Sequence, residues 1–274
     1  MCVDEAYVSH AAVTAASLAV HMPGRVVLHL CVLESGQEKC ASNTFSALTE
    51  PIKHLLWTEI HSIPTHVELG LPPNWSRAQF NRSIGLRLLL PKILPNDLER
   101  VLYLDADTLA LHSLDPLWFE PLDASTLVAA VTDRCYPEGV PTAINRTGRW
   151  HRYFNTGVML INLGAWRSER LSDECLALMK RYSDRLTYPD QDVLNYVIRD
   201  RWRTLPGRWN VLVNCPYEAW PTIRRQQALL TQSSILHYAG PRKPWHRDFP
   251  CGPLRDTYQN FVRLLRKPNR VGVS

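Results

Sequence analysis

Short runs of hydrophobic residues alternate along the chain with segments in which hydrophobic residues recur every three or four positions. The runs have the length of β-strands, and most are nearly continuous in Val, Leu and Ile, which is typical of strands that are covered on both faces. The alternation predicts an α/β fold, in which helices flank a sheet. The predicted strands are Val26–Leu33, Arg100–Leu104, Thr126–Val131, Gly157–Asn162 and Ser234–Tyr238.

Helical periodicity occurs in three segments between and after these strands. Apolar residues of the first segment, from Leu171 to Tyr182, fall on one helix face, and those from Leu254 to Leu265 form a similar stripe near the C-terminus. A third helix is predicted over Asn81–Leu94, because Pro95 would end it. The segment Asp133–His151 is rich in Pro, Gly and Arg and has no clear period, which favours a long loop of the kind that often forms a functional lid.

Composition narrows the class of protein. The 274 residues carry a net charge of +5 without a dense basic stripe, so a nucleic-acid partner is not expected. Pro (20) outnumbers Gly (12), and the glycine-rich phosphate-binding motifs G-x-G-x-x-G and G-x-x-x-x-G-K-[ST] do not occur. No disordered linker divides the chain, so we expect one domain over residues 1–274.

The sequence contains neither a recognisable targeting signal nor a closely spaced pair of cysteines. The longest apolar stretch, Ala11–Val20, is too short for a membrane span and lacks the basic start of a signal peptide, so we expect a cytoplasmic protein. The seven cysteines are scattered, with no C-x-x-C pair, which predicts reduced thiols rather than a zinc site or a disulfide framework.

Two carboxylates follow the predicted strand at Arg100–Leu104. Asp105 and Asp107 are spaced i, i+2, which in an extended chain places both side chains on one face. Two carboxylates so close repel one another unless a cation such as a divalent metal lies between them. The D-x-D pattern alone is weak, since it recurs at Asp190–Asp192, and the alternative is that Asp107 caps a turn while Asp105 is solvated.

A second polar group stands at the end of another predicted strand. His237 ends Ser234–Tyr238, and a turn flanked by proline then presents Lys243. If His237 reaches the two carboxylates, the ligand set of two oxygens and one nitrogen favours Mn²⁺ over Mg²⁺. Lys243 would then meet a phosphate as a point charge. The alternative is an ordinary loop with a solvated lysine and a hydrogen-bonded histidine.

Amides and carboxylates gather in two further motifs. Asn155 lies just before a predicted buried strand, and Asp190 and Gln191 lie at the start of a predicted helix after Pro189. Such side chains in a cleft suit a ligand rich in hydroxyl groups, such as a sugar. For Asp190, capping of the helix N-terminus is an equally good explanation.

Taken in order along the chain, these motifs resemble glycosyltransferase family 8, the retaining enzymes of GT-A fold that use nucleotide-sugars. The resemblance extends from Val3 to about Asp248 and is closest to the bacterial lipooligosaccharide and lipopolysaccharide α-galactosyltransferase or glucosyltransferase type. It implies a Rossmann-like, mixed but mostly parallel sheet flanked by helices. The matching segments are Asp4–Tyr7, Arg87–Pro91, Val101–Asp107, Phe154–Asn162, Asp190–Asp192 and His237–His246.

The resemblance also implies roles for individual residues. Asp105, Asp107 and His237 match the Mn²⁺ ligands, and Mg²⁺ is the second choice. Contacts to the UDP part of the donor match Asp4, Tyr7, Arg87, Ala106, Gly240 and Lys243. Contacts to the donor sugar match Asp133, Asn155, Asp190 and Gln191, of which Gln191 and Asp190 are the candidates for catalysis at the anomeric carbon.

Two positions depart from the family pattern. The family usually has Asn where Ala6 stands and Tyr where Gly85 stands. The loss of one nucleotide contact at Ala6 gives some support to an alternative, a module that binds a nucleotide-sugar or a glycan without turnover. A nucleotide-sugar hydrolase is a further alternative.

The resulting hypothesis is a Mn²⁺-dependent transferase that moves galactose or glucose from a UDP-sugar to a hydroxyl of a glycan or glycolipid such as lipopolysaccharide. The C-terminal residues from about 263 to 274 carry Arg263, Arg266, Lys267 and Arg270, which would favour peripheral contact with the inner face of the membrane. A solvated helix end explains the same residues equally well.

Overall fold

A computed structural model describes residues 1–24, 26–34, 40–71, 76–77, 80–135, 152–213 and 219–266. The strands are β1 (Cys2–Asp4), β2 (Val27–Glu34), β3 (Trp57–Pro64), β4 (Ser76–Arg77), β5 (Phe80–Asn81), β6 (Arg100–Leu104), β7 (Thr108–Ala110), β8 (Val128–Thr132), β9 (Phe154–Asn162), β10 (Trp202–Thr204), β11 (Val211–Leu212) and β12 (Ile235–His237). The α-helices are α1 (Val8–His21), α2 (Cys40–Thr49), α3 (Leu90–Ile93), α4 (Asp115–Trp118), α5 (Leu163–Ser168), α6 (Leu171–Tyr182), α7 (Pro189–Ile198), α8 (Ile223–Gln232) and α9 (Pro253–Leu265). Short 3₁₀ helices are η1 (Glu5–Tyr7), η2 (Glu50–Ile52), η3 (Arg82–Leu89) and η4 (Gly207–Trp209).

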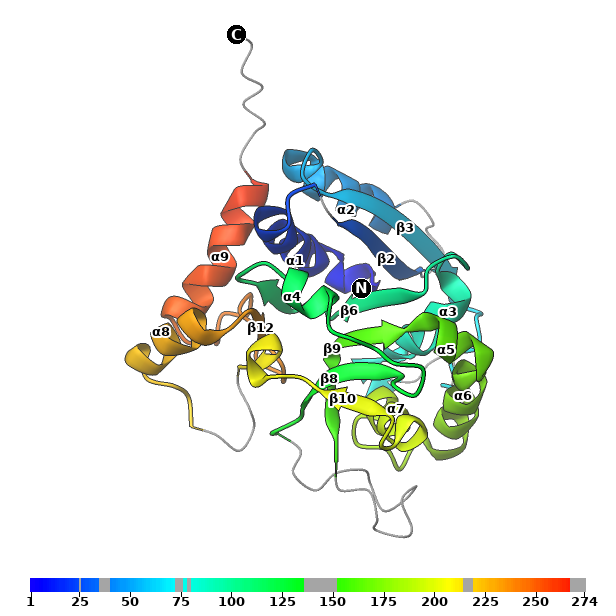
Figure 1. Ribbon diagram of the computed structural model, residues 1–274. Helices are drawn as coiled ribbons and strands as arrows, with labels where there is room; N and C mark the ends of the chain where they lie inside the picture. The colour runs from blue at the N-terminus through cyan, green and yellow to red at the C-terminus, as the bar shows by residue number, and fades with distance from the viewer. Residues whose placement is uncertain are drawn as a thin grey trace.

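The described residues form three larger sheets and the short antiparallel pair β4-β5, and helices lie around the larger sheets (Figure 1). The first has the order β1-β2-β3 and is parallel throughout. The second has the order β10-β8-β9-β6, and β9 runs antiparallel to both of its neighbours. In the third, β12 pairs in parallel with β11 and antiparallel with β7. The α/β architecture with a mixed sheet is therefore as expected.

Both faces of the second sheet are buried, which explains the continuous hydrophobic runs. On β8 and β9, Ala129 and Leu160 face one core cluster, which includes α1. Their neighbours in sequence, Ala130 and Ile161, face the other cluster, which includes α6 and α7. Because successive strand residues point to opposite faces, a strand in this position has no side left for polar residues.

Most predicted elements are confirmed, and two segments differ. The stretch Ala11–Val20 belongs to helix α1, which the pattern did not predict because it is apolar on every face. Its alanines are fully buried, as expected for a helix enclosed by other elements. The predicted α-helix at Asn81–Leu94 is instead mostly the 3₁₀ helix η3, followed by the single turn α3.

Contacts to a neighbouring segment explain that second difference. The guanidinium of Arg82 donates to the carbonyl oxygens of Thr65 and Val67. A Cβ atom at Gly85 would lie 2.9 Å from the carbonyl oxygen of Leu69. The segment therefore follows the adjacent chain closely, and a larger side chain at Gly85 would collide with Leu69.

Three further expectations concern the long loop and the basic tail, a membrane span and the cysteines. Of the predicted long loop, residues 136–151 lie outside the described part of the chain, as do residues 267–274 of the basic tail. Within the described residues, no helix is long and apolar enough to cross a membrane. Cys135 is disulfide-bonded, so the expectation of reduced thiols is wrong at this position.

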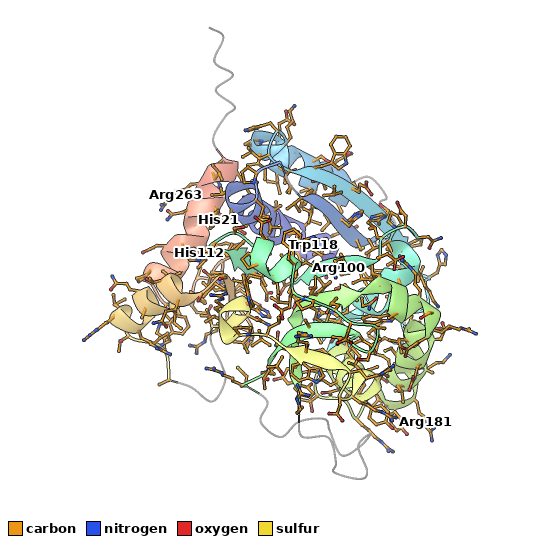
Figure 2. The ribbon with its side chains drawn as sticks, in the orientation of Figure 1. His21, Arg100, His112, Trp118, Arg181 and Arg263 are labelled. Carbon is orange, nitrogen blue, oxygen red and sulfur yellow. The ribbon has the colours of Figure 1, made fainter. Side chains whose placement is uncertain are left out.

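Strand β6 leads from the surface to the interior. At its first residue, the Arg100 guanidinium donates to the carbonyl oxygen of Trp118 and lies 5.8 Å from the centre of the indole ring (Figure 2). Beyond its last residue, Leu104, the chain turns at Asp105–Asp107 and enters β7. The two carboxylates thus stand at the carboxyl end of a buried strand, where α/β sheets bind their ligands.

Candidate active site

A cleft opens where β1, β6 and β12 end and where β9 and α7 begin. It brings together twelve of the thirteen predicted site residues: Tyr7, Arg87, Asp105, Ala106, Asp107, Asp133, Asn155, Asp190, Gln191, His237, Gly240 and Lys243. The exception is Asp4, which does not line the cleft. Its carboxylate accepts a hydrogen bond from the backbone N–H of Tyr7 at 3.0 Å and so caps η1.

The two strand-end carboxylates and His237 converge in the floor of the cleft. Nε2 of His237 lies 3.3 Å from Oδ1 of Asp107 and 3.8 Å from Oδ2 of Asp105. Asp107 and His237 are buried, with 9% and 4% exposure. The antiparallel pairing of β12 with β7 produces this approach, because it sets His237 opposite Thr108, next to Asp107.

Three observations show that these residues fit a divalent cation. Oδ1 of Asp107 is buried and has no hydrogen-bond partner among the described residues. Nδ1 of His237 lies 2.9 Å from Oδ1 of Asn210, which can only accept, so the proton is on Nδ1 and the lone pair of Nε2 points to the carboxylates. Gly157 leaves the space open: a Cβ atom there would lie 2.9 Å from Oδ2 of Asp105 and 2.8 Å from Nδ1 of His237.

Two buried cations accompany the carboxylates. Nζ of Lys243 donates to Oδ2 of Asp107 at 2.5 Å and to the carbonyl oxygen of Tyr238 at 2.8 Å. The Arg87 guanidinium contacts Oδ1 of Asp105 and Oδ2 of Asp190, each at 2.9 Å. We call these residues and His237 the charged end of the cleft. Three carboxylates face two permanent cations there, so one negative charge remains in excess.

Burial and these cations act in opposite directions on the carboxylates. Burial alone would raise the pKa of Asp107, but the ammonium of Lys243 holds it below its ordinary value. For Asp190 burial is the stronger effect, and its pKa is raised despite the guanidinium of Arg87. Asp107 is thus fixed in the ionised form that binds a metal.

The other side of the cleft is built from three amides around one carboxylate, and we call it the amide end: Asn155, Gln191, Asn210 and Asp133. Oδ2 of Asp133 accepts from the amide groups of Asn155 and Gln191, each at 3.0 Å. Oδ1 of Asn155 accepts from Asn210 at 2.8 Å and from the backbone of Gly157 at 3.0 Å. Because Asn210 also accepts from His237, one chain of hydrogen bonds joins the histidine to Gln191.

Helix α7 presents Asp190 and Gln191 from its first turn. Asp192, fully buried, accepts from the backbone N–H groups of Thr187 and Tyr188 and from the hydroxyl of Tyr153, and so fixes the start of the helix. The N-cap residue of α7 is Tyr188, which makes no side-chain cap, and the Asp190 carboxylate pairs with Arg87. Oε1 of Gln191 accepts from the backbone N–H of Thr156 at 3.0 Å, which holds its amide in one orientation.

Aromatic rings form the wall near Tyr7. The ring of Tyr7 meets that of Trp245 edge to face at 5.8 Å, and Trp245 stacks on His10 at 3.6 Å. Burial is the main reason that the pKa of Tyr7 is raised to about 12, so its hydroxyl stays neutral. In the turn that leads to Lys243, Gly240 has a φ of +85°, a backbone conformation that favours glycine.

Sequence reasoning missed three contributors to the site. Asn210 follows η4 and belongs to no motif, so nothing in the sequence points to it. Gly157 lies within a quoted motif, but its role as the space beside His237 needs the pairing of distant strands. Tyr103 donates to Oδ1 of Asp105 at 2.7 Å, and its place two residues before Asp105 on a strand was the one available signal.

The fold and the cleft are those of a glycosyltransferase of the GT-A type. The galactosyltransferase LgtC, solved in complex with donor and acceptor sugar analogues, is similar over 98% of this chain and 95% of that chain, with a TM-score of 0.74 and 26% identity. The chain belongs to glycosyltransferase family 8, whose sequence model matches residues 1–248.

Curated relatives are similar at the level of sequence. General stress protein A of Bacillus subtilis (strain 168) is 26% identical over 285 residues, which covers 99% of this chain and 94% of the relative. Lipopolysaccharide 1,2-glucosyltransferase of Escherichia coli (strain K12) is 31% identical over 177 residues, 63% of this chain and 50% of that protein. The match thus spans about half the length of that glucosyltransferase.

Proposed function

We propose that the protein is a retaining hexosyltransferase that moves galactose or glucose from a UDP-sugar to a hydroxyl of a glycan or glycolipid, with Mn²⁺ as its metal and residues 1–274 as one domain. The observation that carries this is the charged end of the cleft. Its excess negative charge and the unpartnered Oδ1 of Asp107 call for a divalent cation, and two oxygens with one imidazole suit Mn²⁺ better than Mg²⁺.

Asp105, Asp107 and His237 would hold the metal. When bound, the metal supplies Lewis-acid stabilisation of the departing diphosphate. Lys243 and Arg87 place two fixed positive charges where negative charge develops, and they do so in a buried setting that strengthens the effect. The turn at Gly240 and the backbone at Ala106 would lie along the diphosphate, and Tyr7 would stack on the uracil, with Asp4 as its supporting cap.

Asp133, Asn155 and Gln191 of the amide end, together with Asp190 of the charged end, would bind the hydroxyl groups of the hexose. Gln191 has its amide oriented by Thr156 and Asp133, which supports a role in positioning the sugar near the anomeric carbon. Asp190 is paired with Arg87, so its carboxylate is held in place at the same face. Retention then follows either from attack by an acceptor whose proton passes to the leaving phosphate, or from a covalent intermediate on Gln191 or Asp190.

The acceptor is inferred from the relatives. Several of them are named as lipopolysaccharide glucosyltransferases or a galactosyltransferase, which supports a lipopolysaccharide-type acceptor made in the cytoplasm. Peripheral contact with the membrane rests on the basic C-terminal residues. Leu264 and Leu265, however, pack against the core, so any such contact would be electrostatic.

A donor panel tests the proposal. The purified protein is incubated with Mn²⁺ and each of several UDP-sugars, and the release of UDP is measured without acceptor and with candidate lipopolysaccharide fragments. We expect release with UDP-galactose or UDP-glucose, faster with acceptor present. No release with any donor, or release of free sugar at a rate that acceptors leave unchanged, would contradict a transferase.

A further inference from the structure

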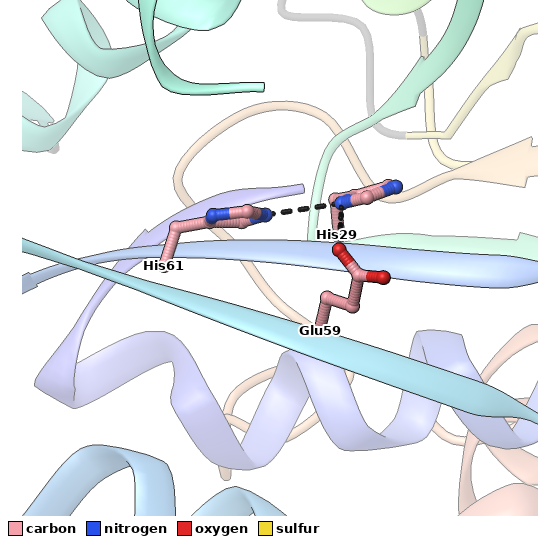
Figure 3. Close-up of side chains that lie close together, drawn as sticks. All are labelled: His29, Glu59 and His61. Carbon is pink, nitrogen blue, oxygen red and sulfur yellow. Dashed lines mark hydrogen bonds and ion pairs between the residues drawn. The ribbon is translucent and has the colours of Figure 1, made fainter. Parts of the chain in front are cut away.

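A second group of metal-ligating side chains lies on the first sheet, outside the cleft. In the parallel pair of β2 and β3, His29 stands opposite Glu59, and His61 stands two residues further along β3 (Figure 3). Alternation along the strands puts all three side chains on one face of the sheet. The other face, with Leu28, is packed into the core around α1.

The three side chains converge on one point. Nδ1 of His29 lies 3.0 Å from Nε2 of His61 and 3.3 Å from Oε2 of Glu59, and all three candidate ligand atoms lie within 4.8 Å of one another (Figure 3). Ligand atoms around a tetrahedral zinc ion are about 3.4 Å apart, given zinc–nitrogen and zinc–oxygen distances near 2.1 Å. The group is therefore close to the geometry of coordination before any ion binds.

The three side chains differ in solvent exposure, which would let an ion reach the group from one side. The His29 side chain is 10% exposed, whereas that of Glu59 is 44% exposed. The two imidazole rings are nearly parallel, at 20°, with centres 5.3 Å apart, so each nitrogen is already directed by its neighbour. A cation can enter from the solvent side, and the fourth coordination position stays open to water.

We propose that His29, Glu59 and His61 form a second metal site that takes Zn²⁺ or a similar borderline cation. Two imidazoles and one carboxylate form a softer ligand set than the two carboxylates and one imidazole of the cleft, so the two sites differ in preference. Because its ligands come from adjacent strands, a bound ion would fasten the edge strand β3 to β2. It would therefore raise the thermal stability of the protein.

The test counts zinc ions in protein that has no affinity tag. Asp107→Asn removes the cleft as a competing site, and the metal-stripped variant is loaded with ZnCl₂, passed into metal-free buffer by gel filtration and assayed for zinc by mass spectrometry. We expect one equivalent of zinc, and none once His61→Ala is added. The matched control is His54→Ala, an exposed histidine outside the group, which should leave the count unchanged.

Thermal melting gives an independent readout. Zinc should raise the melting temperature of the Asp107→Asn protein and should leave that of the double variant where it was. Glu59→Gln, at a half-exposed position, is the second variant if His61→Ala fails to fold, and it should weaken zinc retention. Zinc lost completely on gel filtration, or retained equally after changes at His61 and Glu59, would show an adventitious ion only and would overturn the proposal.

Discussion

The charged end and the amide end of the cleft face the same space, yet their polar groups are satisfied in opposite ways. At the amide end, each of the amide side chains finds its partners within the protein, and Gln191 is held at both its oxygen and its nitrogen. At the charged end, three carboxylates share two cations, and Oδ1 of Asp107 has no hydrogen bond among the described residues. One end is complete without a ligand, and the other is not.

The difference separates positioning from binding. A fully satisfied hydrogen-bond network orients its members, and at the amide end the one carboxylate, Asp133, accepts from two side-chain amides and from the backbone N–H of Cys135. An excess buried charge without such partners is costly until a counter-ion arrives. We therefore expect changes at the charged end to act mainly on metal and donor binding and on the departure of the diphosphate. Changes at the amide end should act mainly on how well the sugar is placed.

The largest effect is expected from Asp107→Asn. The amide keeps the shape of the side chain but removes the charge, so the metal loses a ligand and the charged end loses its excess negative charge. Lewis-acid stabilisation is worth several kcal/mol, so transfer should fall by about 10³-fold or more. The measurement is the rate of UDP release across a Mn²⁺ titration; activity that survives at ordinary Mn²⁺ concentrations would remove the metal from the charged end.

Gly157→Ala tests the space between the two ends. The new methyl group would collide with His237 and approach Oδ2 of Asp105, both of which must move. Displacement of a catalytic group by about 1 Å costs about 10²-fold, and we expect a loss of that size in transfer rate. The matched control is Gly164→Ala in α5, where the methyl group meets the flexible end of Glu99 and makes an ordinary contact with Asn162, so transfer should be unchanged. Equal losses in both variants would mean that the effect is one of stability.

The sequence predicted the charged end better than the amide end, for a physical reason. Asp105 and Asp107 lie on one strand end with a spacing that has a fixed geometric meaning, and His237 follows a strand of the same type. Asn210 has no such spacing to anything, because its contacts to His237 and Asn155 join residues 27 and 55 positions away. Contacts made only by tertiary pairing leave no local pattern in one sequence.

Helix predictions failed where local preference was overruled by neighbours. The periodic pattern at Asn81–Leu94 is real, but Arg82 donates hydrogen bonds to the adjacent segment and Gly85 lies close against Leu69, and the segment takes 3₁₀ geometry instead. Helix α1 was missed for the opposite reason, since a helix buried on all sides has no polar face to reveal its period. Strands buried on both faces, such as β8 and β9, were easier to predict because they have an unbroken apolar pattern, whereas the partly exposed strand β3 was not predicted.

Asn210 links the two ends of the cleft, because it accepts from His237 and donates to Asn155. Two variants separate these roles. Asn210→Ala removes the acceptor for His237 and the donor to Asn155. The loss of a hydrogen-bond partner of a metal ligand typically lowers metal affinity or activity by about 10- to 100-fold. Asn210→Asp keeps an acceptor for His237 but has no amide to donate. We expect it to retain the Mn²⁺ dependence of the wild type with a raised KM for the donor. A loss of Mn²⁺ affinity as large as in Asn210→Ala would show that the two ends are not separable.

The smallest effect concerns acid stability, and Lys243→Met produces it. The pKa of Asp107 is below its ordinary value in the folded protein, so the stabilisation that Asp107 provides is present above its unfolded pKa and is lost as pH falls through the folded one. Without Lys243, that folded pKa rises, and the loss begins at a higher pH. We expect acid unfolding, followed by circular dichroism on metal-free protein, to start at a higher pH in Lys243→Met than in the wild type. Arg242→Met, an exposed cation one residue earlier, should leave the acid transition in place, because exposed charges contribute little. An unchanged acid transition in Lys243→Met would mean that the charged end is neutralised by groups other than its lysine.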